Sequence, residues 1–379
     1  MIGVGHYKTT KTIRDNVKEV LDMGRLSYGK FTKQFEQDFA FIHERKYGVF
    51  CNSGTSALQV ALHTLKIAHG YKDGDEVIVP ALTFVATINI ILQNNMKPVL
   101  VDIDEYYGLD PTKLKAAITP RTKVIIPVHI AGQMCDMQEI MNIAHTHKLK
   151  VIEDSCETMF ASHRGKIAWS AISCYSTYVA HILTTGVGGF ACTNNPEYAE
   201  IIRSLCNHGR DGIYISMEDN KKGKEVIKKR FKFDHVGYSY RATELEAAIG
   251  LAQLTTIRDE IEKRKENAAF LTEHLSKHDE IELPKIRPLT DHVFMFYPIT
   301  IKGNKEQRTR LVEYLEAKGI ETRYLLPLTN QPVYKGLFNE KDYPNAMRCN
   351  NSSFYIACHP GLTKADLLHI IKTFDTYYG

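Results

Sequence analysis

Short apolar runs alternate with amphipathic stretches through roughly the first 250 residues of the chain. The apolar runs have the length of buried strands, and the stretches between them have the periodicity of helices that cover a sheet. This alternation predicts an α/β fold with a largely parallel sheet. The candidate strands are residues 47–51, 76–80, 97–103, 123–130 and 150–154.

The pattern changes after about residue 255. The elements expected beyond it are a long amphipathic connecting helix at 255–277, a strand at 292–302 and helices at 308–319 and 364–378. A chain of this length is long enough for more than one compact unit. We therefore expect a large domain, residues 1–255, and a smaller C-terminal α/β domain, residues 256–379.

A polar turn leads into an apolar helix in the segment NSGTSALQVALHTL, residues 52–65. The first turn of this helix would offer free backbone amides from Gly54 onward, together with the hydroxyls of Thr55 and Ser56, to an anion. Ser, Thr and Asn are also the usual residues that cap a helix. The segment alone therefore fits either a phosphate site or a simple capped helix.

Asp154 ends the apolar strand predicted at 150–154. A carboxylate in such a place is costly unless it has a partner. Ligands of open α/β sheets gather at the carboxyl ends of the strands, where the turn at Gly54 is also expected. Asp154 is thus either part of a ligand site or a cap for the segment that follows.

Composition narrows the possible functions. The content of 44% hydrophobic and 24% charged residues is ordinary for a soluble protein, and the net charge of +4 does not indicate nucleic acid. The basic run KKGKEVIKKR, residues 221–230, is either a solvated loop or a segment that approaches a substrate diphosphate. No stretch approaches the roughly 20 apolar residues that span a bilayer, so no membrane partner is expected.

The eight cysteines are dispersed and no secretory signal precedes them. This predicts reduced thiols in a cytoplasmic protein. The sequence contains no C-x-x-C pair and no regular metal-ligand spacing. We expect neither a metal nor an iron–sulfur cluster.

Five collinear blocks resemble the DegT/DnrJ/EryC1 family of sugar aminotransferases. They are NSGTSAL (52–58), IVPALTFVATIN (78–89), VIEDSCE (151–157), CYSTYVAHILTTGVGG (174–189) and GYSYRATELEAAIGLAQL (237–254). The resemblance implies the aspartate aminotransferase fold, a pyridoxal 5′-phosphate or pyridoxamine 5′-phosphate cofactor and a nucleotide-linked keto sugar as substrate. It also implies a homodimer with active sites between two chains.

His181 stands where the family pattern has the lysine that holds the cofactor covalently, and no lysine occurs between Lys166 and Lys221. A lysine there both anchors the cofactor and moves a proton. Histidine keeps only the second role, for which its ordinary pKa near 6.5 is suited. The resemblance therefore implies that His181 is a catalytic base and that the cofactor is held in its amine form, pyridoxamine phosphate. A structural histidine, or a lesion in a silenced paralogue, is the alternative.

The resemblance also assigns the other cofactor contacts. Asp154 would pair with the pyridine nitrogen, Phe84 would stack on the ring, and Glu157 stands where aminotransferases have glutamine. The residues expected to hold the phosphate are Gly54, Thr55, Ser56 and Ser176, with Ser239 in place of an asparagine that reaches across the dimer. Val179 and Val187 also depart from the family pattern, and Arg241 is expected at the start of a long helix, to support the cofactor region or the dimer, or to form an ion pair.

Histidine at the lysine position and glutamate at 157 together resemble the branch of lysine-lacking 3-dehydratases, which includes the GDP-4-keto-6-deoxymannose 3-dehydratases. The expected reaction is removal of the 3-hydroxyl from a nucleotide-linked 4-keto-6-deoxyhexose, with glutamate as amino donor. Two alternatives remain, an aminotransferase-like enzyme with atypical chemistry and a non-catalytic paralogue that binds cofactor or nucleotide sugar. The sequence leaves the nucleotide and the sugar open.

Overall fold

The computed structural model describes residues 1–211 and 231–379. The basic run at 221–230 lies outside the described residues. Within them, no helix combines the length and the apolar character that a membrane crossing requires.

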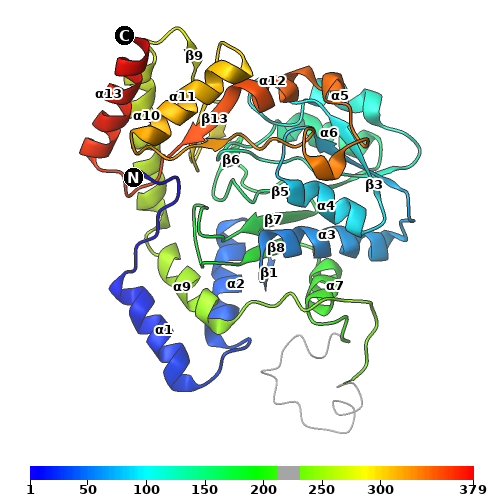
Figure 1. Cartoon of the computed structure of the whole chain (residues 1–379). Coiled ribbons are helices and arrows are strands. Elements are labelled where there is room, and N and C mark those ends of the chain that lie inside the picture. Colours follow the sequence, from blue (N-terminus) through cyan, green and yellow to red (C-terminus); the bar gives the residue numbers. More distant parts are fainter. Residues whose placement is uncertain (212–230) are drawn as a thin grey trace.

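A seven-stranded sheet forms the centre of the larger part of the molecule (Figure 1). In sheet order the strands are β1 (Tyr47–Cys51), β8 (Gly189–Thr193), β7 (Ile172–Ser176), β5 (Lys150–Asp154), β4 (Thr122–Ile125), β2 (Glu76–Pro80) and β3 (Lys97–Val101). Strand β8 runs antiparallel to both of its neighbours, and the other pairs are parallel. The predicted α/β fold with a mainly parallel sheet is confirmed.

Helices pack around this sheet and share one apolar core with it. They are α1 (Lys11–Met23), α2 (Lys30–Ile42), α3 (Gly54–His69), α4 (Val85–Gln93), α5 (Pro111–Leu114), α6 (Met137–Thr146), α7 (Pro196–Cys206) and α9 (Glu244–Leu254), with the short 3₁₀ helix η1 (Lys115–Ala117). Helix α3 contacts β7 and β8, and its first residue, Gly54, lies against Ser176 at the end of β7.

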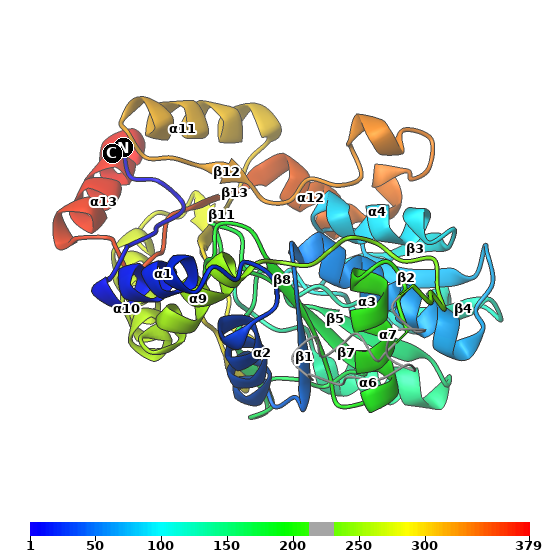
Figure 2. The ribbon, with the colours of Figure 1, turned by 90° about the horizontal axis from the view of Figure 1, so that it is seen from below.

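The C-terminal elements lie to one side of the large sheet (Figure 1, Figure 2). Strands β12 (Arg323–Tyr324), β13 (Ser353–Ile356), β11 (Tyr297–Ile301) and β9 (Ile281–Glu282) form an antiparallel sheet in this order. The other elements of this part are α10 (Ile257–Leu275), α11 (Lys305–Ala317), α12 (Pro344–Ser352), α13 (Lys364–Tyr378), η3 (Pro332–Tyr334) and η4 (Glu340–Asp342). A separate apolar cluster lies here, and Ile2 packs against it. The domain boundary at 255 stays a prediction.

Several predicted elements have different ends in the structure. The strand expected at 123–130 ends at Ile125, two residues before Pro127, which has no N–H to donate to a sheet. The strand expected at 292–302 begins only at Tyr297, because Phe294 has a φ of 45° and its neighbours bond to the turn at 131–132. The strand expected at 97–103 ends at Val101, and the helix expected at 308–319 spans 305–317. The pair β6 (Ser162–His163) and β10 (Thr290–Asp291) was not predicted.

Glu244 joins helix α9 to helix α2. Its buried carboxylate accepts hydrogen bonds from the backbone N–H groups of Gly29, Phe31 and Thr32 at 2.7, 3.0 and 2.8 Å. The N-cap residue of α2 is Gly29, which has no side chain that could satisfy these groups. The carboxylate therefore takes the place of a helix cap.

Replacing Glu244 with alanine is expected to lower the free energy of unfolding by about 3 kcal/mol, because buried N–H groups then lose a charged acceptor. Urea denaturation followed by circular dichroism measures the change. The matched control is Glu19→Ala, since Glu19 forms an exposed ion pair with Lys30 and should contribute no more than about 0.5 kcal/mol. Equal shifts of the two variants would contradict the capping role.

Candidate active site

A cavity of about 730 Å³ opens at the carboxyl ends of β5 and β7. The predicted site residues that line it are Gly54, Thr55, Phe84, Asp154, Glu157, Ser176 and His181. These residues come from segments that are spread over more than 100 positions of the sequence. The structure thus brings together most of the residues that the motifs singled out.

The first turn of α3 meets the end of β7 at Gly54. A methyl group on Gly54 would lie 2.7 Å from the Ser176 Cβ and 2.9 Å from the Cys156 Sγ, so only glycine allows this approach. Thr55 is exposed at the cavity wall, next to backbone N–H groups that have no partner within the helix. A helix start beside a serine hydroxyl is a suitable cradle for a phosphate.

Ser56 lies outside the cavity lining. Its hydroxyl donates to the Asn52 Oδ1 at 2.7 Å, and its N–H donates to the Ser53 hydroxyl, which caps α3, at 3.0 Å. The side chain therefore takes part in the capping arrangement, the alternative that the residue types left open.

Ser239 also lies outside the lining, in an exposed segment before α9. Its hydroxyl accepts a hydrogen bond from the Arg241 Nη2 at 3.2 Å. Arg241 does not begin the helix as predicted, because α9 starts at Glu244 and is capped by Thr243. A contact of Ser239 with the cofactor of a second chain stays a prediction.

Phe84 is the N-cap residue of α4 and stands at the cavity wall with 60% of its surface exposed. It therefore does not belong to the apolar core, as a phenylalanine in an apolar segment usually does. An exposed ring at a cavity wall is able to stack on a planar ligand.

Asp154 ends β5 with only 4% of its surface exposed. Its carboxylate accepts from the Thr87 hydroxyl at 2.8 Å and from the Cys156 N–H at 3.2 Å. Burial raises the pKa of Asp154 above its usual range. In the described part of the chain no cationic side chain forms an ion pair with Asp154, so a protonated ring nitrogen in the cavity would provide the missing partner.

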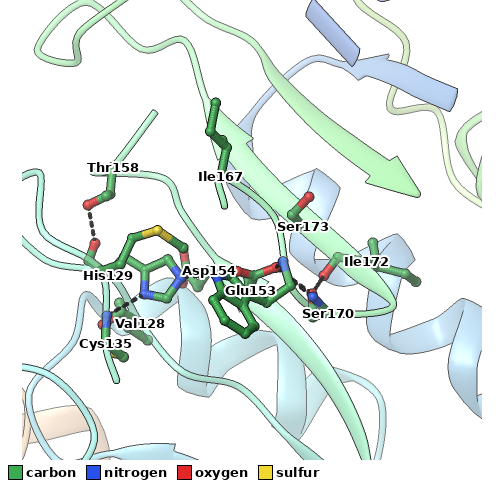
Figure 3. A network of polar contacts seen from close by, with 12 residues as sticks. Val128, His129, Cys135, Glu153, Asp154, Thr158, Ile167, Ser170, Ile172 and Ser173 are labelled. Atoms are coloured by element: carbon green, nitrogen blue, oxygen red, sulfur yellow. Dashed lines mark hydrogen bonds and ion pairs between the residues drawn. The ribbon is translucent and has the colours of Figure 1, made fainter. Parts of the chain in front are cut away.

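Glu153 precedes Asp154 on β5 and takes part in a buried network of polar contacts (Figure 3). It accepts hydrogen bonds from the Ser170 hydroxyl at 2.7 Å and the His129 Nε2 at 3.4 Å, and it pairs with Arg45 at 3.3 Å. Burial alone would raise the pKa of Glu153, but these partners lower it to about 2. The network holds the end of β5, because the backbone N–H of His129 also donates to the backbone carbonyl of Asp154 at 2.9 Å.

His181 follows β7 and is half-buried at the cavity wall. Its Nδ1 lies 2.6 Å from the Cys156 carbonyl oxygen. A carbonyl only accepts, so in the neutral ring Nδ1 carries the hydrogen and Nε2 is the unprotonated nitrogen. Burial lowers the pKa of His181 to about 4. The imidazole is therefore neutral near pH 7 and able to accept a proton at Nε2.

Glu157 lies on the same wall and accepts the Ala131 N–H at 3.3 Å. Burial raises the pKa of Glu157 to about 8, and the charge of Asp154 adds to the effect. Its carboxyl group is thus protonated at neutral pH and able to donate a hydrogen bond.

The sequence motifs do not include the part of the lining that comes from the C-terminal elements. These residues include Met295, Arg323, Tyr324, Gln331 and Tyr355. Arg323 is the single arginine or lysine among the described residues of the lining. No local pattern marks these residues, whereas the missed Thr87 lies inside the quoted block 78–89 and Cys156 inside 151–157.

The chain is similar to known proteins along nearly its whole length. It is 37% identical to GDP-perosamine synthase of Caulobacter vibrioides over 369 residues, which cover 96% of this chain and 94% of the relative. It is 32% identical to dTDP-4-dehydro-2,6-dideoxy-D-glucose 3-dehydratase of Saccharopolyspora spinosa, with coverage of 92% and 80%.

The structure of Escherichia coli GDP-4-keto-6-deoxy-D-mannose-3-dehydratase with bound hydrated PLP has a TM-score of 0.89 to this chain, at 25% identity and with coverage of 98% and 99%. This likeness confirms the predicted fold of pyridoxal-phosphate-dependent aminotransferases. Together with the family match below, it confirms the predicted cofactor, pyridoxal phosphate or its amine form. The model of the DegT/DnrJ/EryC1/StrS aminotransferase family matches residues 8–375, and the chain therefore belongs to this family.

Proposed function

We propose that the protein is a pyridoxamine-phosphate-dependent 3-dehydratase, which removes the 3-hydroxyl of a nucleotide-linked 4-keto-6-deoxyhexose. The observation that carries the proposal is the state of His181 in the cavity. It is a neutral imidazole whose Nε2 is unprotonated, at the position where the family has its lysine. A base that cannot hold the cofactor covalently suits chemistry that uses the amine form.

Pyridoxamine phosphate, when bound, supplies an amine that engages a ketone and a ring that accepts electrons. Asp154 would hold the positive charge of the ring nitrogen, and Phe84 would cover one face of the ring. The first turn of α3 and the Ser176 hydroxyl would bind the phosphate. His181 would accept at Nε2 the proton that leaves the carbon next to the ring, and would return it later.

The names of three relatives and the positive charge of Arg323 in the cavity lining support a nucleotide sugar as the substrate. The names of three relatives refer to sugars linked to GDP or dTDP. In this chain Arg323 lines the cavity, and its guanidinium would bind the diphosphate of such a substrate. We also propose a homodimer, in which Ser239 of one chain approaches the cofactor of the other, and glutamate as the source of the amine.

An aminotransferase is the second candidate, because the relative that is 37% identical is a GDP-perosamine synthase. The absence of a lysine at position 181 argues against it. Such enzymes use this lysine both to release the product and to move the proton.

The test is to incubate the purified protein with pyridoxamine phosphate, glutamate and a panel of GDP-, CDP- and dTDP-linked 4-keto-6-deoxyhexoses, and to follow sugar mass. Loss of one oxygen together with release of ammonia would support the dehydratase. An amino sugar would make the protein an aminotransferase, and bound cofactor without turnover of any sugar would favour a binding paralogue. In parallel, a His181→Lys variant should hold pyridoxal phosphate covalently after borohydride reduction.

The pH dependence of kcat/KM is expected to reflect Glu157. Its protonated carboxyl group is present below a pKa of about 8 and is lost as pH rises through that value. If the group donates a hydrogen bond to the bound ligand, kcat/KM falls above about pH 8 in the parent protein. Glu157→Gln keeps a donor at every pH and should abolish this alkaline limb. An unchanged alkaline limb in the variant would assign it to another group.

A further inference from the structure

The first residues of the chain are bound to the C-terminal elements. Figure 1 shows the N-terminal segment running from these elements toward α1. Ile2 forms a parallel bridge with Ile320, in which the Ile2 N–H donates to the Gly319 carbonyl at 2.7 Å and the Ile2 carbonyl accepts the Glu321 N–H at 2.9 Å. The segment therefore enters the region beside β12 in a fixed register.

Glu321 connects this segment to the cavity mouth. One carboxylate oxygen, Oε2, accepts the Val4 N–H at 2.7 Å. The other oxygen, Oε1, accepts from the Nη2 of Arg323, the arginine of the cavity lining. The backbone of Val4 thus fixes the carboxylate that orients Arg323. Without the Val4 N–H, the Glu321 side chain would lose a fixed contact. Ordering the partly exposed side chains of Glu321 and Arg323 as a pair would then cost more side-chain entropy.

The other end of the segment is held near His181. A methyl group on Gly5 would lie 3.5 Å from the Ala180 Cα and 3.7 Å from the Val179 carbonyl oxygen, in van der Waals contact with the loop before the histidine. The His6 ring stacks on His359 with centroids 5.0 Å apart and an angle of 17° between the planes. The His359 Nε2 donates to the Gly3 carbonyl at 2.9 Å.

Gly361 leaves the space that the His6 ring occupies. A methyl group on Gly361 would lie 2.4 Å from the His6 ring, so a larger residue would displace it. The segment is consequently fixed on both sides of Val4, and Val4 presents its N–H to Glu321 in one orientation.

We propose that residues 2–6 are a positioning element of the active site, which holds Arg323 at the cavity mouth through Glu321 to receive the diphosphate of the substrate. The inference rests on the proposed function, because it takes a nucleotide sugar as the substrate. Val4 and Glu321 act through Arg323, so their loss should weaken the binding of the nucleotide part and leave the reacting end of the cavity intact.

The test variant is Val4→Pro, which removes the N–H that Glu321 accepts and also restricts the backbone at residues 3 and 4. Calorimetry with GDP, CDP and dTDP measures the Kd for the nucleoside diphosphate, and steady-state kinetics measures KM and kcat. We expect Kd and KM to rise about tenfold, the effect of one lost hydrogen bond to a charged group, while kcat and pyridoxamine phosphate affinity stay within about twofold. The matched control is Lys8→Pro, since the Lys8 N–H makes no hydrogen bond within the described residues.

A second variant, Glu321→Ala, should raise Kd as much as Val4→Pro does, and the double variant should be no weaker than either, because both changes break one chain of contacts. The inference would be overturned by an unchanged Kd in Val4→Pro, or by equal losses in both proline variants. If the parent protein binds a nucleoside diphosphate in that case, the proposed function is unaffected. A parent protein that binds none of the three diphosphates would overturn the proposed function and this inference together.

Discussion

Replacing His181 with asparagine is expected to lower kcat by roughly 10²- to 10⁴-fold, the range that a positioned base contributes. The asparagine amide is able to donate to the Cys156 carbonyl as the Nδ1 hydrogen of His181 does, so the local structure should survive. It offers no lone pair that accepts a proton at neutral pH. Binding of pyridoxamine phosphate, measured by absorbance titration, should stay within about threefold of the parent value.

The control for this experiment is His369→Asn, because His369 is exposed on α13, outside the cavity lining. Its kcat should equal that of the parent protein. The pH profile gives a second readout. The neutral form of His181 is the base, and its pKa is lowered to about 4. Activity should therefore persist well below pH 6.5 and decline only as pH falls toward about 4. An active His181→Asn variant would show that another group moves the proton.

The site residues that the sequence predicted are those whose role is indicated by a short segment of the chain. Gly54 begins a helix after a strand, Asp154 ends an apolar strand, and His181 is placed by its spacing from the glycines at 188 and 189. Each of these features is contained in one short block, and strand ends of a parallel sheet meet at one edge. The likeness of the blocks to a known family then gave them their chemical roles.

The features that the sequence did not predict depend on tertiary contacts or on side-chain direction. Arg323 and Tyr355 reach the cavity from a second sheet, more than 140 residues beyond His181, and no local pattern marks them. Ser56 has the residue type of both a phosphate ligand and a helix cap, and its hydroxyl turns to Asn52. The Val4–Glu321 contact joins residues 317 positions apart through a backbone N–H, which no side-chain motif records.

Replacing Asp154 with asparagine is expected to weaken binding of pyridoxamine phosphate roughly a hundredfold, the effect of removing one partner from a buried charged pair. The amide is close to the carboxylate in shape, and its oxygen is able to accept from the Cys156 N–H as Oδ1 does. Its NH2 group takes the place of Oδ2 and is able to donate to the Thr87 hydroxyl oxygen, whose hydrogen then turns to the Thr83 hydroxyl. The change therefore removes the charge with little change in shape. Equilibrium dialysis of the cofactor measures the effect without any substrate.

Thr87→Val provides the matched control for Asp154, because it removes the hydroxyl bond to the carboxylate and leaves the charge in place. One hydrogen bond to a charged group accounts for about tenfold in affinity, so this variant should fall between the parent protein and Asp154→Asn. The order of the three affinities separates the contribution of the Asp154 charge from that of its hydrogen bond with Thr87. If Asp154→Asn binds as tightly as the parent protein, the buried carboxylate is not the partner of a ring nitrogen, and its raised pKa reflects only its burial.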